Sequence, residues 1–313
     1  MVAFIGRRIA GAIPTLLLMS FIAFGIVRLI PGDPAAVIAG PTATPAEVER
    51  VRSRLGLDQP FHQQLVAWYG NALRGDLGNS ILLGRSVVRA IGERLPVTLS
   101  LAALAMAWTA LFGIAAGVMA SVRALSWVDQ TVLAVCLLGV SLPNFGLALL
   151  LIEFFGVDLG WLPTGGYVAF SENPIGWARS LILPSIALAL PQIAIVARTT
   201  RASMLEVLRQ DYIRTARAKG LSRAVVIGRH ALKNAMVAVL TVLGVSMAIL
   251  ISGSVVIESV FSLPGLGRLL ATSILTRDYP VIQGGLLLVA AGLVALNLAI
   301  DLVYMAVDPR LRP

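Results

Sequence analysis

Residues 234–257 read NAMVAVLTVLGVSMAILISGSVVI, a run without a single charged side chain. A helix crosses the hydrocarbon core of a bilayer in about 20 residues, so this run is long enough to span a membrane. Lipid offers no hydrogen-bond partners, so a spanning backbone must pair its own N–H and C=O groups, as an α-helix does. The run therefore predicts a transmembrane helix.

Similar charge-free windows, rich in Leu, Ile, Val and Ala, occur at 9–27, 95–122, 130–152, 180–197 and 279–300. The whole chain agrees, since 58% of its residues are hydrophobic and 13% are charged, whereas soluble domains have about 25% charged residues. We predict an all-α membrane protein with six transmembrane helices, forming a single domain over residues 1–313. Four prolines, Pro14, Pro143, Pro184 and Pro191, lie inside these windows, and prolines in membrane helices often mark places where the bundle bends.

The first window follows Arg7 and Arg8, as the apolar part of a secretory signal peptide would. A signal peptide has an apolar stretch of roughly 7–15 residues followed by a small-residue cleavage site. Residues 9–27 are longer than that, and no clean cleavage site follows them. We therefore expect a retained first helix.

Basic residues are divided unequally between the two sides of the predicted bundle. With the N-terminus in the cytoplasm, the cytoplasmic segments hold fourteen Lys and Arg residues and the short outside loops hold three. Long segments cross membranes largely regardless of charge, so the basic residues within 28–94 do not count. The bias predicts that both termini are cytoplasmic. Because the basic residues are dispersed among apolar spans, the net charge of +9 does not indicate a nucleic-acid partner.

The outside segment, residues 31–94, is too polar to span and is patterned for helices. Residues 44–47, Thr-Pro-Ala-Glu, have the spacing of a capping box, and the helix that they begin should end near Gly56. A second helix should begin near Pro60 and end at Gly75. Its apolar face would consist of Phe61, Leu65, Trp68 and Ala72. The segment is interpreted either as a cap packed on the rim of the bundle or as a docking platform for an extracytoplasmic partner, and the two are compatible.

The inside loop, residues 198–233, is basic and also patterned. A short helix is predicted from Asp211 to Lys219, with Gly220 as the left-handed residue that ends it. Ser222 is a candidate N-cap for a second short helix running to His230. Basic residues whose only roles were to set the orientation of the protein in the membrane and to contact anionic lipid would not need two short helices joined at a glycine. We therefore favour a compact helical knob on the cytoplasmic face.

This loop, DYIRTARAKGLS at 211–222 followed by RHALKNA at 229–235, resembles the Glu-Ala-Ala loop of binding-protein-dependent ABC importer permeases. The general family signature has Glu where Arg214 stands and Pro where Lys233 stands. Both departures are usual in the dipeptide, oligopeptide, nickel and glutathione branch. Gly220 takes the place of the family's glycine.

Other stretches resemble the same branch in order along essentially the whole chain. They are GRRIAGAIPTLLLMSFIAF at 6–24, PGDPA at 31–35, LGLDQP at 55–60, GDLGNS at 75–80, GVSLPNF at 139–145, WLPTGG at 161–166, VIESVFSLPGLGRLL at 256–270, RDYPVIQG at 277–284 and VDPRLR at 307–312. One such motif is weak evidence for the family, but this many motifs in the same order make the resemblance strong. IPGDPAAVIAG at 30–40 also resembles the glutathione permeases.

The resemblance implies the type I ABC importer permease fold in the bacterial inner membrane. It implies one half of a translocation pathway for di- and oligopeptides delivered by an extracytoplasmic binding protein. The implied partners are a second homologous permease subunit and two ABC ATPase subunits. The residues implied to couple to an ATPase are Asp211, Tyr212, Arg214, Thr215, Ala216, Arg217, Ala218, Lys219, Gly220, Leu221, Ser222 and His230.

We find no catalytic, nucleotide-binding or metal-binding motif in the sequence. It has no glycine-rich phosphate loop of the G-x-x-x-x-G-K-[ST] type, so ATP and Mg²⁺ would be bound by partner subunits. Two histidines and Cys136 form no catalytic or metal-binding pattern, and Cys136 is expected to be a packing residue. Glu153, Glu258 and Asp301 stand at the ends of predicted spans, where we expect them to reach the membrane interface and to have structural roles. The alternatives are the same architecture carrying glutathione or nickel, and a secondary transporter or channel.

Overall fold

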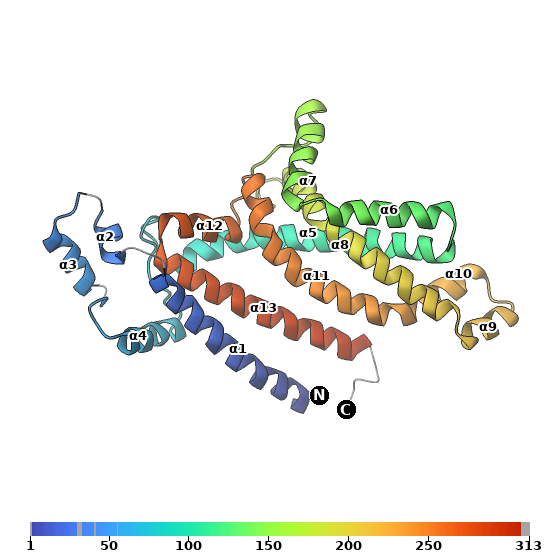
Figure 1. Ribbon diagram of the computed structural model, residues 1–313, viewed down its shortest axis with the longest axis horizontal. Helices are drawn as coiled ribbons and strands as arrows, with labels where there is room; N and C mark the ends of the chain where they lie inside the picture. The colour runs from blue at the N-terminus through green and yellow to red at the C-terminus, as the bar shows by residue number, and fades with distance from the viewer. Residues whose placement is uncertain (1, 30–32, 41, 55, 308–313) are drawn as a thin grey trace. The chain divides into compact units, whose positions relative to one another are not determined.

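The computed structural model describes the backbone of residues 2–29, 33–40, 42–54 and 56–307, and side chains at 10–25, 33, 35–36, 39–40, 42–53 and 56–300. The secondary structure of the described residues is helical, without a strand (Figure 1). The chain forms two compact units. One comprises Met1–Pro96 and Arg268–Leu298, and the other comprises Val97–Gly267 and Ala299–Pro313.

The first unit contains the first helix, the polar segment that follows it and most of the last helix. Its elements are α1 (Val2–Leu29), α2 (Pro34–Ala39), α3 (Pro45–Arg54), α4 (Phe61–Leu73), the start of α5 (Val87–Val122), most of α12 (Leu266–Thr276) and most of α13 (Tyr279–Val307). The predicted capping box begins α3, because Thr44 N donates to Glu47 Oε2 over 2.7 Å and Glu47 N donates to Thr44 Oγ1 over 3.4 Å. The hydrogen bonds from Thr44 hold the pKa of the Glu47 carboxyl below its usual range. The chain then turns at Gly56, which has a φ of +66°.

Helix α4 packs onto α1 through the apolar face that the sequence predicts. The ring centroid of Phe24 lies 5.4 Å from that of Phe61 and 5.6 Å from that of Trp68. The hydroxyls of Ser20 and Tyr69 are 2.7 Å apart. These contacts fit the interpretation of the segment as a cap, and the helix is followed by Gly75, whose φ of +81° turns the chain as predicted.

The buried carboxylate of Asp278 fastens the loop before α5 to the start of α13. It accepts hydrogen bonds from Ser80 Oγ, from Ile81 N over 3.2 Å and from Leu82 N over 3.3 Å. These contacts join two of the motifs that carry the resemblance, residues 75–80 and 277–284. The loop is therefore held by a charged acceptor rather than by apolar contact alone.

The second unit is built around α8 (Pro174–Leu208), against which α6 (Trp127–Ser141), α7 (Asn144–Leu151) and α11 (Lys233–Val260) pack. The remaining elements are most of α5, a π-helical segment Ile152–Asp158, α9 (Asp211–Ala218), α10 (Arg223–Val225) and a second π-helical segment Val226–Leu232. Leu181, Leu188 and Leu250 are at the centre of its core. Cys136 is buried beside Ala194 and Ala197, which agrees with a packing role.

Four described helices are long and apolar enough to cross a membrane: Val87–Val122, Pro174–Leu208, Arg223–Val260 and Tyr279–Ile300. The count rises to five if α6 and the helix after it form one broken span. The first predicted window lies in α1, whose stretch Ala10–Gly25 is a shorter apolar helix. The described residues therefore establish several membrane-length helices, while six spans stays a prediction.

The third predicted window, 130–152, is not one continuous helix. It breaks between Ser141 and Asn144, and the two halves differ in direction by 104°. Pro143 has no N–H, and the residue before a proline is kept out of the helical region. Leu142 accordingly has φ −83° and ψ +131°. The bend expected at Pro143 is thus large enough to split the window.

Charged residues do not stop the helices where the apolar windows end. Helix α8 continues through Arg198 and Arg201 to Leu208, so much of the predicted loop 198–233 is helical. Arg, Glu and Leu all have high helix propensity, so a charged residue by itself does not end a helix. Glu258, expected to reach an interface, is instead fully buried. Glu153 is exposed, and the side chain of Asp301 lies outside the described residues.

Candidate functional site

Helix α9 ends in the geometry that its sequence predicts. Gly220 has a φ of +78°, in the left-handed region that glycine occupies without a Cβ penalty. Gly220 N donates to Arg217 O over 3.0 Å, and Leu221 N donates to Ala216 O over 3.4 Å. These two bonds form a Schellman motif, which satisfies carbonyls at the helix end. The turn after α9 is therefore fixed by backbone hydrogen bonds.

The inner face of α9 is anchored in a small apolar core. Ile213 is fully buried and Ala216 is 8% exposed, and they belong to one cluster with Met204, Val226 and Ala231. Met204 belongs to α8, whereas Val226 and Ala231 belong to the π-helical segment that leads into α11. A movement of α9 would therefore pull on the ends of both long helices.

The outer face of α9 and its turn is open. Of the predicted coupling residues, those exposed are Asp211, Tyr212, Arg214, Thr215, Arg217, Ala218, Lys219, Gly220, Leu221 and Ser222. The exceptions are Ala216, which packs inward, and His230, which is half-buried in the π-helical segment. The backbone oxygen of His230 accepts a hydrogen bond from Asn234 Nδ2 over 2.7 Å. His230 therefore lies on the rod leading into α11 and not on the knob.

The second short helix, predicted to end at His230, does not end there. Residues Arg223–Val260 form one continuous helical rod, with the π-helical turn inside it. No glycine or proline occurs between 229 and 243 to end the helix, and Lys233 stands where the general signature has proline. Ser222 occupies the N-cap position with extended backbone, but its side chain makes no capping hydrogen bond.

Two family models match the chain. One, described as a binding-protein-dependent transport system inner membrane component, matches residues 113–313, and the corresponding model for the N-terminal part matches residues 1–102. The chain belongs to this family. This permease is accordingly a multi-pass protein of the bacterial cytoplasmic membrane, and its family implies ATPase and binding-protein components as partners.

Relatives of the permease align over nearly its full length. A Brucella abortus (strain 2308) protein, named for a peptide transport system permease, is 53% identical over 312 residues, covering 100% of this chain and 99% of the relative. The glutathione transport system permease protein GsiC of Escherichia coli (strain K12) is 43% identical over 312 residues, with coverage of 100% and 99%.

Solved structures agree on the fold. A chain of the MetNI methionine ABC transporter in an inward-facing conformation matches with a TM-score of 0.59 at 19% identity, covering 70% of the permease and 96% of that chain. A chain of an amino acid ABC transporter, solved with histidines, matches with a TM-score of 0.51 at 18% identity, covering 71% and 94%. At such identities the likeness shows the fold alone, which is that of ABC importer permeases.

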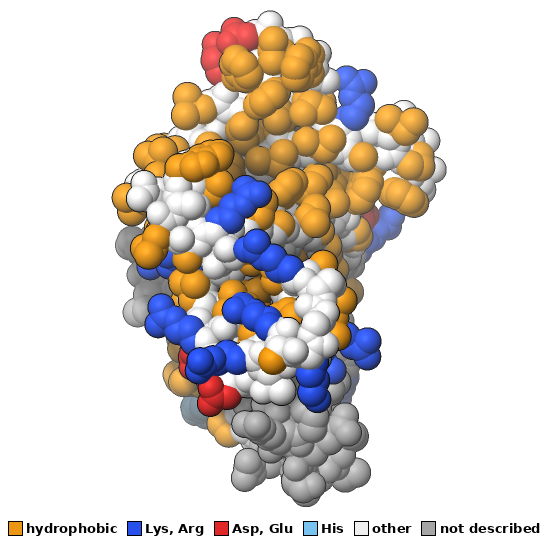
Figure 2. Space-filling model, turned by 90° about the vertical axis from the view of Figure 1, so that its right-hand side faces the viewer, with side chains coloured by type: hydrophobic (Ala, Val, Ile, Leu, Met, Phe, Trp, Pro, Cys, Tyr) orange, Lys and Arg blue, Asp and Glu red, His pale blue; other side chains and the backbone are white. Residues whose placement is uncertain are grey.

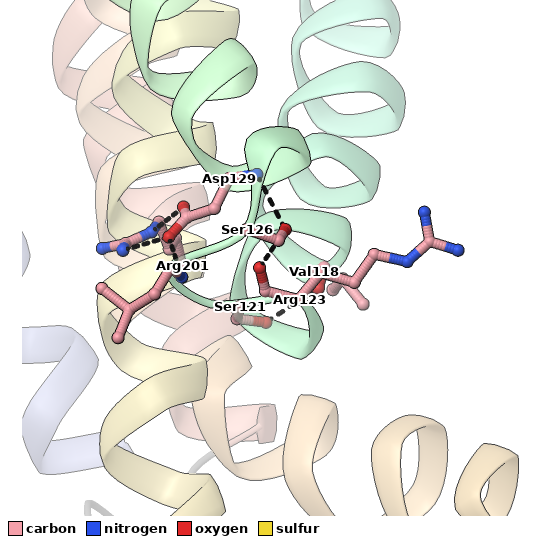
Figure 3. A network of polar contacts seen from close by, with 7 residues as sticks. Val118, Ser121, Arg123, Ser126, Asp129 and Arg201 are labelled. Carbon is pink, nitrogen blue, oxygen red and sulfur yellow. Dashed lines mark hydrogen bonds and ion pairs between the residues drawn. The ribbon is translucent and has the colours of Figure 1, made fainter.

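An ion pair with a buried carboxylate, at the same end of the unit, was not singled out from the sequence. Figure 3 shows Arg201 of α8 facing Asp129 in the first turn of α6, and Ser126 and Arg123 in the α5–α6 turn beside them. Ser126 Oγ accepts from Asp129 N, and Leu125 N donates to Asp129 Oδ2 over 2.9 Å. The signal available in the sequence was Ser126 followed three residues later by an acid, at the edge of an apolar window.

Helix α5 approaches α8 closely through two glycines, Gly113 and Gly117. A Cβ placed on Gly117 would lie 2.4 Å from Thr200 Cβ and 2.6 Å from Ala197 O. Gly113 and Gly117 form the small-xxx-small pattern that lets membrane helices approach each other. The pattern was readable in the sequence, whereas the partner helix was not.

Proposed function

We propose that this permease forms one half of the translocation pathway of an ATP-driven importer of di- and oligopeptides. The observation that supports this most is α9, a short helix with an exposed polar outer face, a fixed end at Gly220 and an inner face anchored to α8 and α11. A rigid element anchored to two long helices suits transmission of force from a partner. Because the family implies ATPase components, membership of it supports an ATPase as that partner.

In the proposed assembly, a second homologous permease completes the pathway, and two ABC ATPase subunits contact the two knobs from the cytoplasm. Both termini are cytoplasmic and six helices cross the membrane. ATP and Mg²⁺ are bound by the ATPases, because this chain has no phosphate-binding loop of the G-x-x-x-x-G-K-[ST] type. Closure of the ATPases would move the knobs together and reopen the bundle outward, as rigid-body alternating access.

An extracytoplasmic binding protein would deliver the cargo to the segment 31–94. Peptide is the first choice of cargo because the Brucella relative, named for peptide transport, is 53% identical. Glutathione is the alternative, since GsiC of Escherichia coli is 43% identical over the same length. Nickel is a further alternative from the branch resemblance, and a permease need not ligate the ion that it passes. Among the described residues, no three His, Cys, Asp or Glu side chains are grouped to hold a metal ion.

The proposal is tested by purifying the tagged permease from its native membrane in a mild detergent and identifying the co-purifying proteins by mass spectrometry. We expect a second permease, one or two kinds of ATPase subunit and a secreted binding protein. That binding protein is then titrated with dipeptides, oligopeptides, glutathione and Ni²⁺. Tight binding of peptides supports the proposed cargo, and preference for glutathione or Ni²⁺ replaces it.

Recovery of the permease alone under several mild conditions would contradict the importer proposal. It would favour the other class considered, a secondary transporter or channel, and would leave the anchored α9 without a function.

A further inference from the structure

A cleft of about 500 Å³ opens beside α9, within the second unit. Its walls come from the ends of α5, α8 and α9 and from the start of the rod that leads into α11. Three of its lining residues are arginines, Arg209, Arg217 and Arg223, and none is acidic. The cleft is therefore a concave site with three positive charges.

The charge of these arginines is not neutralised within the described residues. Arg209 and Arg217 make no ion pair or side-chain hydrogen bond to any described residue. Arg223 uses Nη2 to bind Val122 O at the end of α5 over 3.2 Å, which is a neutral acceptor. The nearby carboxylate of Asp211 lies 3.6 Å from Arg214 on the outer face of α9 and does not line the cleft.

The rest of the lining is largely apolar, with Leu208, Leu221 and Val226 among the side chains. Figure 2 shows Lys and Arg side chains gathered on this end of the molecule with hydrophobic side chains between them. A small hydrated anion would leave the apolar wall unused. A phosphate ester that also carries an apolar portion would use both.

We propose that the cleft binds the headgroup of an anionic phospholipid from the cytoplasmic leaflet. The phosphate contacts Arg209 and Arg217, and the glycerol and the first acyl carbons lie against the leucine and valine side chains. The charge-free window of α5, a membrane-length helix, ends at Val122, which lines the cleft, so a lipid headgroup at the end of that span can reach it. The inference rests on the orientation given in the proposed function. A bound lipid would connect α5 and α8 to the anchored end of α9.

The test uses the complete transporter, purified and exchanged into phosphatidylcholine nanodiscs, with retained phosphatidylglycerol measured by native mass spectrometry. The variant Arg209→Gln/Arg217→Gln removes two charges from the cleft. Each basic residue near an anionic headgroup contributes enough to change binding about fivefold, so we expect retention to weaken on the order of 25-fold. The matched control is Arg198→Gln/Arg229→Gln, which removes two exposed charges that neither line the cleft nor belong to the predicted coupling residues, and it should leave retention unchanged. Equal losses in both double variants would mean a diffuse basic surface and would overturn the inference.

A second measurement keeps the inference testable if the cleft variant assembles poorly. A photoactivatable phosphatidylglycerol should label residues 205–227 of the unaltered permease, and excess phosphatidylglycerol should prevent the labelling whereas phosphatidylcholine should not. Equal protection by millimolar inorganic phosphate would assign the cleft to a free anion and overturn the lipid assignment. Labelling seen only in preparations lacking the ATPase would assign the cleft to the ATPase surface.

The inference and the proposed function fail in different ways. Loss of ATPase co-purification with retained phosphatidylglycerol would contradict the importer proposal and leave the lipid site. Normal co-purification with no selective phosphatidylglycerol retention would contradict the lipid site and leave the importer proposal.

Discussion

Asp129 and Arg201 form a two-pronged ion pair, with Arg201 Nε 2.5 Å from Oδ1 and Nη2 2.7 Å from Oδ2. The Asp129 side chain is 2% exposed and that of Arg201 is 22% exposed. The pair joins the start of α6 to α8, ten residues before α9 begins. It therefore fixes the part of α8 that carries the candidate coupling helix.

Arg201→Gln should lower the free energy of unfolding more than Asp129→Asn. The first change leaves a fully buried carboxylate without its counter-ion, which costs about 3–5 kcal/mol. The second leaves a partly exposed guanidinium that can turn towards water, so we expect a cost of about 1–2 kcal/mol. Thermal unfolding in one detergent measures both, with Arg198→Gln, an exposed residue on the same helix, as the control. Equal small effects of all three changes would show that the pair contributes little.

Gly220→Ala should reduce uptake whereas Gly228→Ala should not. A Cβ meets no atom within 4 Å at either glycine, and only Gly220 has a positive φ. The left-handed region costs a non-glycine residue roughly 1–2 kcal/mol, and a β-branched residue more. Gly220→Val should therefore abolish transport and Gly220→Asn should be the mildest change, measured as labelled peptide uptake at matched expression. Normal uptake by Gly220→Val would remove the role assigned to this turn.

Local signals explain which features the sequence could predict. The capping box at Thr44 and Glu47 and the end of α9 at Gly220 depend on residues three to five positions apart. Such patterns are nearly independent of the rest of the fold. The prediction for the window 130–152 was incomplete because Pro143 indicates a bend but not the size of that bend. The size depends on tertiary packing.

Distant pairings were not predictable from one sequence. Asp129 and Arg201 are 72 positions apart, and Thr98 and Glu258 are 160 apart. Hydrophobicity alone placed Glu258 at a span end, whereas the fold buries it completely. Windows defined by the absence of charge also underestimated the length of α8, because the helix continues through Arg198 and Arg201 beyond its apolar region.

Gly117→Ala should destabilise the permease by about 1–3 kcal/mol, the usual cost of overpacking. The added methyl would overlap the Ala197 carbonyl oxygen, which is backbone and cannot rotate away. For the same reason Thr200→Ala should not rescue the variant. The control is Gly92→Ala in the same helix, where a Cβ meets no atom within 4 Å. Comparable thermal stability of the two variants would contradict the close approach of α5 and α8.

Thr98→Val should be more damaging than Thr98→Ser, although valine has nearly the shape of threonine. Thr98 Oγ1 donates to Glu258 Oε1 over 2.6 Å and accepts from Leu266 N over 2.9 Å, and all these groups are buried. Valine removes both hydrogen bonds of the Thr98 hydroxyl, and the loss of a hydrogen bond to a buried polar group costs about 1–3 kcal/mol. Serine keeps the hydroxyl and loses only a methyl group. We expect a marked fall in thermal stability for valine and a small one for serine. If serine lowered the thermal stability more than valine, the methyl group and its packing, rather than the hydroxyl, would hold the segment 261–266 against α5.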